Sequence, residues 1–348
     1  MNNCIASCPA AWRVFILVFT LACFSGLFAL PAFAAESGRK VNVMVSIAAQ
    51  KYFVEKVGGR YVDVSVLLPP GASPHSFEPR PSQMVELGNA DLYMAIGVEY
   101  EKALLPKIKP MHPDLRIVQT DSGISKISMV PNSHDHDHHH GHDHSHDHEH
   151  HHDGHGHEDH ANAHGHDHGN SHKHGHGHHN HEGRDPHVWL SPDTVQVMAG
   201  NIYQALAESL PEKTGYFQDN HINFKREIML LDQEIKGVFA KVEPGTKFMV
   251  FHPAWGYFAR SYGLVQVPIE IQGKEPKPAD LKHLIDMALH ENIKFVFISP
   301  QFSERSARVI VDSIGGQTIS IDPLAEDWEK NMRTVAEKFR GVLEKGHY

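Results

Sequence analysis

The sequence predicts an α/β protein of two lobes, each with a parallel-type sheet flanked by helices, joined by one long rigid linker helix. Two observations support this prediction. Short apolar, β-rich runs alternate with helical patterns in both halves of the chain, which is typical of parallel strands with helical crossovers. Between the halves, residues 214–242 form one continuous helical pattern. The 348-residue chain is long enough for two lobes that each bury a core.

The first lobe is expected to cover residues 35–213. The helix after the first strand stops at Gly58-Gly59, and the second strand breaks at Pro69-Pro70-Gly71. Ser191-Pro192-Asp193 supplies an N-cap, a proline at the first helical position and an early acid, so a helix should begin there. The expected strands are residues 41–47, 61–68, 91–98 and 116–120, and the expected helices are residues 48–57, 81–89, 99–108 and 192–210.

The linker helix carries apolar residues at helical spacing, namely Phe217, Phe224, Ile228, Leu231, Ile235 and Val238. At 1.5 Å per residue it should be roughly 40 Å long, enough to span two lobes. A coiled coil with another chain would need more heptads than are present. The second lobe is expected over residues 243–348, with strands at 247–251, 264–270, 294–299 and 317–321 and helices at 255–262, 277–291, 304–314 and 326–344.

The N-terminus resembles a secretory signal peptide. Arg13 precedes an apolar run over residues 14–30, and Ala32-Phe33-Ala34 fits the small-x-small cleavage pattern. We therefore expect residues 1–34 to be removed near Ala34 and the protein to be exported to the periplasm. An uncleaved anchor is the alternative, but the apolar run is slightly short for a bilayer. Lipoprotein anchoring through Cys23 is disfavoured because Thr20 stands where a leucine is expected.

The cysteines Cys4, Cys8 and Cys23 all lie within this signal segment. The exported protein would therefore have no disulfide and no thiolate ligand, despite an oxidising destination. Any tight metal site must then be built from His, Asp and Glu side chains. The sequence also lacks HExxH, GxSxG and P-loop motifs, which argues against an enzyme, although Glu78 and Glu270 remain possible general bases.

A histidine-rich tract over residues 134–181 contains 24 histidines in 48 residues. It has no large apolar side chains, so we expect a disordered loop inserted into the first lobe. Imidazoles bind divalent metals, which makes the tract an accessory weak zinc site; a solvated spacer is the alternative. The candidate accessory ligands are His134, His136, His138, His139, His140, His142, His144, His146, His148, His150, His151 and His152.

The tract also accounts for most of the net charge. With seven Asp, two Glu and one Lys it contributes −8 of the formal −10, so the remainder of the chain is nearly neutral. A nearly neutral body without a cluster of Lys and Arg does not favour nucleic acid or an anionic membrane surface as partner.

Candidate tight ligands follow the predicted strands. His75 lies in the loop after the 61–68 strand, His252 directly follows the 247–251 strand, and Asp322 directly follows the 317–321 strand. Ligands bind beyond the carboxyl ends of parallel strands, so these side chains occupy binding positions. His187 lies in a turn formed by Asp185-Pro186. Each also has a structural alternative: a loop residue for His75, the end of the tract for His187, and capping roles for His252 and Asp322. Together, three imidazoles and one carboxylate match a zinc site.

Four motifs resemble the zinc-binding, ZnuA-type solute-binding proteins of bacterial ABC importers, and they occur in order along the mature chain. They are Gly71-Ala-Ser-Pro-His-Ser-Phe-Glu-Pro-Arg-Pro-Ser82, Asp185-Pro-His-Val-Trp-Leu-Ser-Pro192, Phe251-His-Pro-Ala-Trp-Gly-Tyr-Phe258 and Ser320-Ile-Asp-Pro-Leu324.

The resemblance implies a metal ion held in the cleft between two α/β lobes. His75 and His187 would come from the first lobe and His252 from the second, with Asp322 or a water completing the shell. Some zinc members carry Glu directly before the first ligand, where this chain has Pro74. Manganese members have Glu at the position of His252, so the imidazole here favours zinc.

The expected function is capture of Zn²⁺ by an exported monomer and its delivery to an ABC importer permease driven by a cytoplasmic ATPase, with no stable membrane insertion after signal cleavage. The tract would act as a low-affinity zinc collector or sensor. Affinity should fall as pH drops through the histidine range near 6.5. The stiff linker favours small lobe movements. The alternatives are a manganese or iron carrier of the same fold, a storage or chaperone protein acting through the tract, and a zinc hydrolase.

Overall fold

The computed structural model describes residues 38–129, 183–270 and 274–343. From Val41 onward the chain forms one compact unit. The expected signal peptide, residues 1–34, and the histidine-rich tract, residues 134–181, lie outside the described residues. Among the helices that are described, none has both the length and the apolar character needed to cross a membrane.

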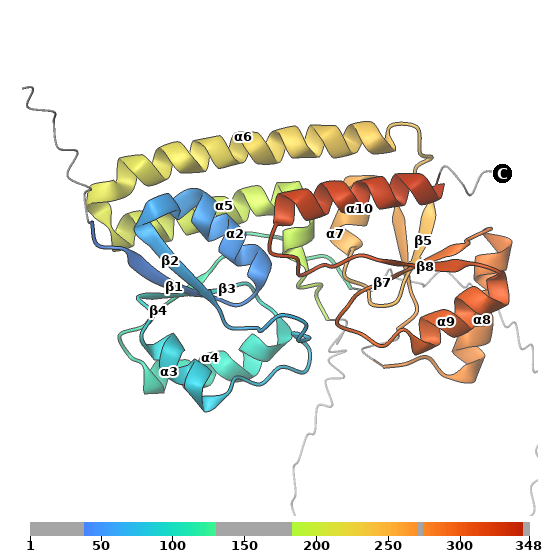
Figure 1. Cartoon of the computed structure of the whole chain (residues 1–348), viewed down its shortest axis with the longest axis horizontal. Helices are drawn as coiled ribbons and strands as arrows, with labels where there is room; N and C mark the ends of the chain where they lie inside the picture. The colour runs from blue at the N-terminus through green and yellow to red at the C-terminus, as the bar shows by residue number, and fades with distance from the viewer. Residues whose placement is uncertain (1–37, 130–182, 271–273, 344–348) are drawn as a thin grey trace, which may run out of the picture. The chain divides into compact units, whose positions relative to one another are not determined.

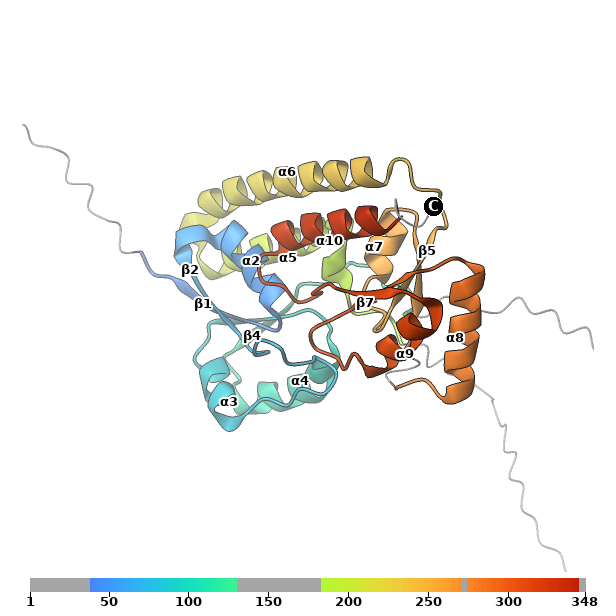
Figure 2. The same cartoon turned by 45° about the vertical axis from the view of Figure 1, so that its right-hand side comes forward.

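The N-terminal lobe is built on a four-stranded parallel sheet with the strand order β2-β1-β3-β4. Its strands are β1 (Val41–Val45), β2 (Val62–Val66), β3 (Leu92–Ala95) and β4 (Arg116–Gln119). Helices α2 (Ala48–Gly58), α3 (Pro81–Gly88) and α4 (Glu99–Met111) make the crossovers, and α5 (Pro192–Ser209) follows β4 later in the chain. Helices α3 and α4 cover one face of the sheet, and α2 and α5 cover the other (Figures 1 and 2).

The C-terminal lobe repeats this plan with the strand order β6-β5-β7-β8, again all parallel. Its strands are β5 (Lys247–Val250), β6 (Val265–Pro268), β7 (Phe295–Ile298) and β8 (Gln317–Ser320), and its helices are α7 (Gly256–Ser261), α8 (Pro278–His290), α9 (Arg305–Ile314) and α10 (Trp328–Leu343). The predicted fold class, two parallel sheets flanked by helices, is confirmed.

Helix α6 (Thr214–Phe239) joins the lobes. Its 26 residues are about 39 Å long at 1.5 Å per residue. One face packs on α5 and α2 of the first lobe and on α10 of the second (Figure 1). The buried residues recur at helical spacing and are Phe217, Phe224, Ile228, Leu231, Asp232, Ile235 and Phe239. The helix stops three residues before the expected end at 242, because the chain turns there towards Pro244-Gly245.

The two lobes share one hydrophobic core, which runs from β1 and α2 through α6 to α10. Two buried indoles bond across the lobes. Trp189 Nε1 donates to the Pro323 carbonyl at 2.6 Å, and Trp328 Nε1 donates to the Trp189 carbonyl at 2.6 Å. A second cluster lies under α8 and α9 on the outer face of the C-terminal sheet. Because the lobes are packed and hydrogen-bonded together, they do not behave as independent domains.

A short antiparallel bridge brings together the two chain segments that flank residues 130–182. Ser128 pairs with Arg184, Met129 N–H donates to the Gly183 carbonyl at 3.3 Å, and Asp185 N–H donates to the Ile127 carbonyl at 2.9 Å. The chain therefore leaves and re-enters the described structure at the same place, directly before Asp185.

Candidate metal centre

Three histidines far apart in the sequence meet between the lobes. His75 lies in the loop after β2, His187 immediately precedes a 3₁₀ turn over Val188–Leu190, and His252 follows β5. One ring nitrogen of each lies within 4.8 Å of the other two. The Nε2 atoms of His75 and His252 are 3.0 Å apart, and those of His252 and His187 are 3.3 Å apart. All three imidazoles thus turn the same nitrogen towards one point.

Each of these histidines has a carboxylate beside its other ring nitrogen. Asp185 Oδ1 lies 2.7 Å from His187 Nδ1, and Glu270 Oε2 lies 3.2 Å from His252 Nδ1. Glu99 Oε2 lies 3.4 Å from the third Nδ1, that of His75. A carboxylate at Nδ1 favours the tautomer that carries its proton there and leaves a lone pair on Nε2. The arrangement therefore presents three nitrogen donors to a shared cation position.

Asp185 is held from both lobes. It is fully buried, and its Oδ1 also accepts the His187 N–H at 2.9 Å. From the second lobe, Tyr257 donates its hydroxyl to the Asp185 carbonyl at 3.0 Å. The start of α7 also approaches closely: a Cβ at Gly256 would lie 2.8 Å from Asp185 Oδ2. Glycine is needed there because any larger residue would push into the carboxylate that orients His187.

The parallel sheet itself brings His252 and Glu270 together. Their strands β5 and β6 are neighbours, and the pairing continues past the strand ends, where Glu270 N–H donates to the Phe251 carbonyl at 3.0 Å. The His252 side chain is only 3% exposed, and the Phe302 ring stacks on it at 4.6 Å. His252 is therefore fixed by the sheet and by ring packing.

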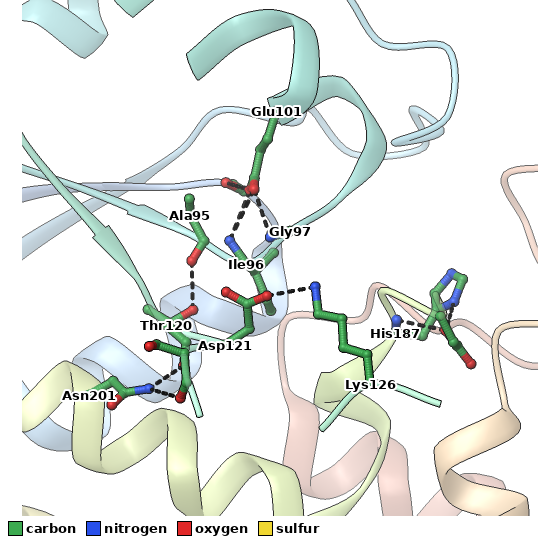
Figure 3. A network of polar contacts seen from close by, with 12 residues as sticks. Ala95, Ile96, Gly97, Glu101, Thr120, Asp121, Lys126, His187 and Asn201 are labelled. Atoms are coloured by element: carbon green, nitrogen blue, oxygen red, sulfur yellow. Dashed lines mark hydrogen bonds and ion pairs between the residues drawn. The ribbon is translucent and has the colours of Figure 1, made fainter. Parts of the chain in front are cut away.

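His75 is the most accessible member, with a side chain that is 27% exposed. Its partner Glu99 opens α4, and the turn before this helix is secured by the buried Glu101. The carboxylate of Glu101 accepts the Gly97 N–H at 2.7 Å and the Ile96 N–H at 3.0 Å, as Figure 3 shows. A loop therefore supplies His75, and a braced helix start supplies the carboxylate beside it.

An ion pair, also drawn in Figure 3, lies between the end of the N-terminal sheet and His187. Lys126 Nζ is 2.6 Å from Asp121 Oδ2, and the pair packs closely against Gly97. Asn201 of α5 donates to the Thr120 carbonyl at 2.8 Å and braces the end of β4. These contacts fix the chain from β4 to the bridge that precedes Asp185.

Burial keeps two of the imidazoles neutral. Burial, and secondarily the neighbouring His252, lower the pKa of His75 to about 4. Burial also lowers the pKa of His252 from its usual value of 6.5. A neutral imidazole is the form that binds a metal ion, so at neutral pH these two side chains need to lose no proton before binding.

Asp322 is not brought into the histidine cluster. It directly follows the extension of β8, as expected, but its Oδ1 accepts the Leu324 N–H at 2.9 Å and an amide N–H of Gln301 at 2.8 Å. The group of possible ligand atoms found among the described residues contains the three histidines without it. The local turn uses the carboxylate that the sequence pattern suggested as a ligand.

The sequence did not predict the carboxylates that lie beside the three histidines. Asp185 was assigned only to a rigid turn, and Glu270 was considered only as a possible base. Glu99 was not considered, because its contact with His75 depends on how α4 packs beside the 71–80 loop. The position of Glu270 directly after a strand next to β5 was the available signal. The accessory candidates from His134 to His152 lie outside the described residues.

The chain matches a known protein family over most of its length. Residues 43–342 match the family model described as "Zinc-uptake complex component A periplasmic". Among curated relatives, the "High-affinity zinc uptake system protein ZnuA" of Paracoccus denitrificans is 36% identical over 325 residues, covering 92% of this chain and 94% of the relative.

Solved structures of similar fold include zinc-bound and manganese-bound proteins. A ZnuA deletion mutant with zinc bound has a TM-score of 0.70 and 34% identity, covering 87% of this chain and 98% of that chain. A Mn-bound periplasmic metal-binding protein mutant from Candidatus Liberibacter asiaticus has a TM-score of 0.66, covering 87% of this chain and all of that one. At 17% identity, this second likeness concerns the fold alone.

Proposed function

This chain belongs to the family of periplasmic zinc-uptake components, and from that premise we propose that it captures Zn²⁺ between its lobes and delivers it to the permease of an ABC importer. Members of this family are metal-binding components of transport systems and not enzymes, so we exclude the zinc-hydrolase alternative. Zn²⁺ is the cargo in this proposal. His75, His187 and His252 are its protein ligands.

The observation that carries the proposal is the convergence of three Nε2 atoms, each with a carboxylate at the opposite ring nitrogen. Carboxylate-backed imidazoles are the usual construction of zinc sites in proteins. Manganese favours oxygen donors, whereas zinc accepts an all-nitrogen set readily. The nitrogen donor His252 and the zinc-uptake relatives therefore favour zinc over manganese as the cargo.

The fourth ligand position is assigned to a water or another small ligand. Asp322 would have to give up the two hydrogen bonds accepted by its Oδ1, or rotate its other oxygen across, before it could bind the ion. Asp322→Asn should therefore change zinc affinity by less than about threefold, within the range of exposed polar contacts. A loss of a hundredfold would place Asp322 in the shell.

We also propose where the protein acts and with which partners. Residues 1–34 act as a signal peptide cleaved near Ala34, and the mature protein is a periplasmic monomer. Its partners are the importer permease and the cytoplasmic ATPase that drives it. Family membership supports a transporter partner. The histidine-rich tract, residues 134–181, serves as a weak collector or sensor of zinc beside the tight site.

The decisive experiment is a titration of metal-free protein with Zn²⁺ and with Mn²⁺, in the wild type and in a variant lacking residues 134–181. We expect one tight zinc site in both proteins, much weaker manganese binding, and fewer total zinc ions in the deletion variant. If the tight site disappears with the tract, the protein stores or chaperones metal through the tract. If Mn²⁺ binds as tightly as Zn²⁺, the manganese carrier is correct.

A further inference from the structure

Phe302 contacts one candidate ligand from each lobe. It lies in the loop between β7 and α9 of the C-terminal lobe. Its ring stacks on the ring of His252, with centroids 4.6 Å apart and an interplanar angle of 22°, and its centroid lies 5.9 Å from that of His75. Both distances fall within the roughly 4.5 to 7 Å at which aromatic rings attract each other. A side chain of the second lobe therefore packs against a histidine of the first.

The ring of Phe302 is held in place by its own lobe. The Phe302 N–H donates to the Ser299 carbonyl at 3.1 Å, and the ring lies 5.9 Å from that of Phe251. It is also packed against the hydrophobic cluster under α8 and α9. The neighbouring Gln301 donates its amide N–H to Asp322 Oδ1 at 2.8 Å, which ties the loop to the end of β8. Phe302 therefore forms a fixed wall beside the cluster of histidines.

His75 is held less firmly than His252. It lies in a loop, and two polar contacts hold it within the first lobe: its N–H donates to Ser73 Oγ at 3.4 Å, and its Nδ1 lies 3.4 Å from Glu99 Oε2. Both distances exceed the roughly 2.7 to 3.2 Å of a normal hydrogen bond. His252, in contrast, directly follows a strand and is buried. The packing of Phe302 on His75 therefore matters more for the position of His75 than for that of His252.

The energy of this contact sets the size of the expected effect. A side chain that is already in position when the metal ion arrives loses less conformational freedom on binding, so the ion is held more tightly. One aromatic contact corresponds to a factor of about three to ten in an equilibrium constant. Loss of the Phe302 ring should therefore weaken the hold of His75 on the ion by a factor of this size.

We propose that Phe302 is a positioning residue of the metal site, whose ring holds His75 in place for coordination and thereby slows the release of zinc. The inference rests on the proposed function. Phe302 binds no metal itself and acts through His75. Because the loop of His75 belongs to the first lobe and Phe302 to the second, the contact also keeps the two sides of the site together. Zinc is released when His75 separates from this ring.

The test is the rate at which full-length protein, loaded with one equivalent of Zn²⁺, gives up the ion to an excess of a chromogenic chelator. Phe302→Leu and Phe302→Met lack the ring and should release zinc about threefold to tenfold faster than the wild type. Phe302→Tyr keeps the ring and should release it at the wild-type rate. Phe295→Ala is the matched control, since this partly buried phenylalanine begins the same strand, β7, and lines a separate cavity with Lys247 and Glu291.

A double-mutant cycle with His75→Ala shows whether Phe302 acts through His75. Zinc affinity is measured by chelator competition in the wild type, the two single variants and the double variant. Once His75 is alanine, Phe302→Leu should change the affinity by less than about twofold, which is the usual limit of additivity. A purely structural role would give the same loss in both backgrounds. Denaturant unfolding of the metal-free proteins shows that each variant is folded.

The outcomes separate this inference from the proposed function. If the wild type binds zinc tightly and both ringless variants release it at the wild-type rate, the inference is wrong and the zinc site stands. The same conclusion follows if Phe302→Tyr or Phe295→Ala releases zinc as fast as Phe302→Leu, or if Phe302→Leu costs as much without His75 as with it. If the wild type has no tight zinc site, the proposed function fails, and the inference fails with it.

Discussion

The N-terminal and C-terminal lobes share a strand order but fill the carboxyl ends of their central strands differently. Strand β1 of the first lobe leads into Ser46, whose hydroxyl bonds to the buried Tyr93 and Glu101. The matching strand of the second lobe, β5, leads into His252, which is backed by Glu270 from the neighbouring strand. At the end of its central strand, one sheet carries an internal polar network, and the other carries an imidazole that belongs to the histidine cluster.

The two lobes also differ in how deeply they bury the histidines that they contribute. The second lobe supplies the candidate ligand His252 directly after a strand of its sheet, with a side chain that is 3% exposed. The first lobe supplies the buried His187, with a side chain that is 4% exposed, and His75 from a loop, with a side chain that is 27% exposed. Preorganised ligands contribute more to affinity because less ordering is needed on binding. The buried histidines, His252 and His187, should therefore dominate metal affinity, and His75 should control access.

The largest expected effect is that of His252→Ala. Removing the sheet-rooted ligand should weaken tight zinc binding by more than about 100-fold, because even residues behind metal ligands cost 10- to 100-fold. Competition with a chromogenic zinc chelator measures this loss. His290→Ala is the matched control, since that histidine is 86% exposed on α8 and should behave as wild type. Equal losses in the two variants would mean that binding does not depend on the cleft.

The contact between the lobes is tested by Gly256→Ala. The added Cβ would meet Asp185 Oδ2 at 2.8 Å, so the variant must shift α7 or the carboxylate. Overpacking of this kind costs about 1 to 3 kcal/mol of unfolding free energy. Denaturant unfolding of metal-free protein measures it. Gly341→Ala is the control, because a Cβ there meets nothing within 4 Å. If Gly256→Ala leaves the free energy of unfolding unchanged, the contact between the lobes at Asp185 is loose.

A smaller effect is expected from removing the charge of Glu270, beside His252, or of Glu99, beside His75. Glu270→Gln should weaken zinc binding about tenfold, at the lower end of the cost for a buried partner of a metal ligand. Glu99→Gln should cost about twofold to threefold, because its contact with His75 is longer and more exposed. The same chelator competition applies to both variants. If Glu99→Gln proves the more damaging, the exposed His75 and not the buried His252 contributes more to the affinity.

The smallest effect is expected from pH between 7.5 and 5.5. Protons compete with zinc for imidazole, so affinity falls as pH falls. Burial lowers the pKa of His75 to about 4, so this histidine stays almost entirely neutral in this interval, and burial also lowers the pKa of His252 below 6.5. The steep loss expected near pH 6.5 from ordinary histidines should move to lower pH. Zinc affinity measured at pH 7.5, 6.5, 5.5 and 4.5 tests this, and a steep fall centred at 6.5 would contradict it.

The fold could be predicted because alternating strands and helices leave few topologies open. Ligands of parallel sheets bind beyond the carboxyl ends of the strands. This rule predicted that His75 and His252 follow strand ends, as they do. It also placed Asp322 there, but a hydrogen bond within its own turn, from the Leu324 N–H, decides where that carboxylate points. Local hydrogen bonding of an aspartate competes with ligand roles, and spacing alone does not reveal which wins.

The carboxylate partners were harder to predict, for a different reason. Glu99 meets His75 only because α4 packs beside the loop after β2, a contact that no periodicity encodes. The contact between Glu270 and His252 follows from the pairing of β5 with β6, which becomes known only once the strand order is known. The sequence therefore predicts which residues follow strands, but it does not predict which residues distant in the sequence come into contact.

The bridge between Ser128 and Arg184 has a consequence for engineering. The main chain leaves at Met129 and returns at Gly183 within hydrogen-bonding distance, so the intervening length can change without moving either end. Proteins tolerate inserted domains best where such ends already lie together. A fluorescent reporter with adjacent termini, spliced between these residues, would sit two residues from Asp185, on whose carboxylate the orientation of His187 depends. The junction is therefore a ready attachment point for a genetically encoded zinc sensor.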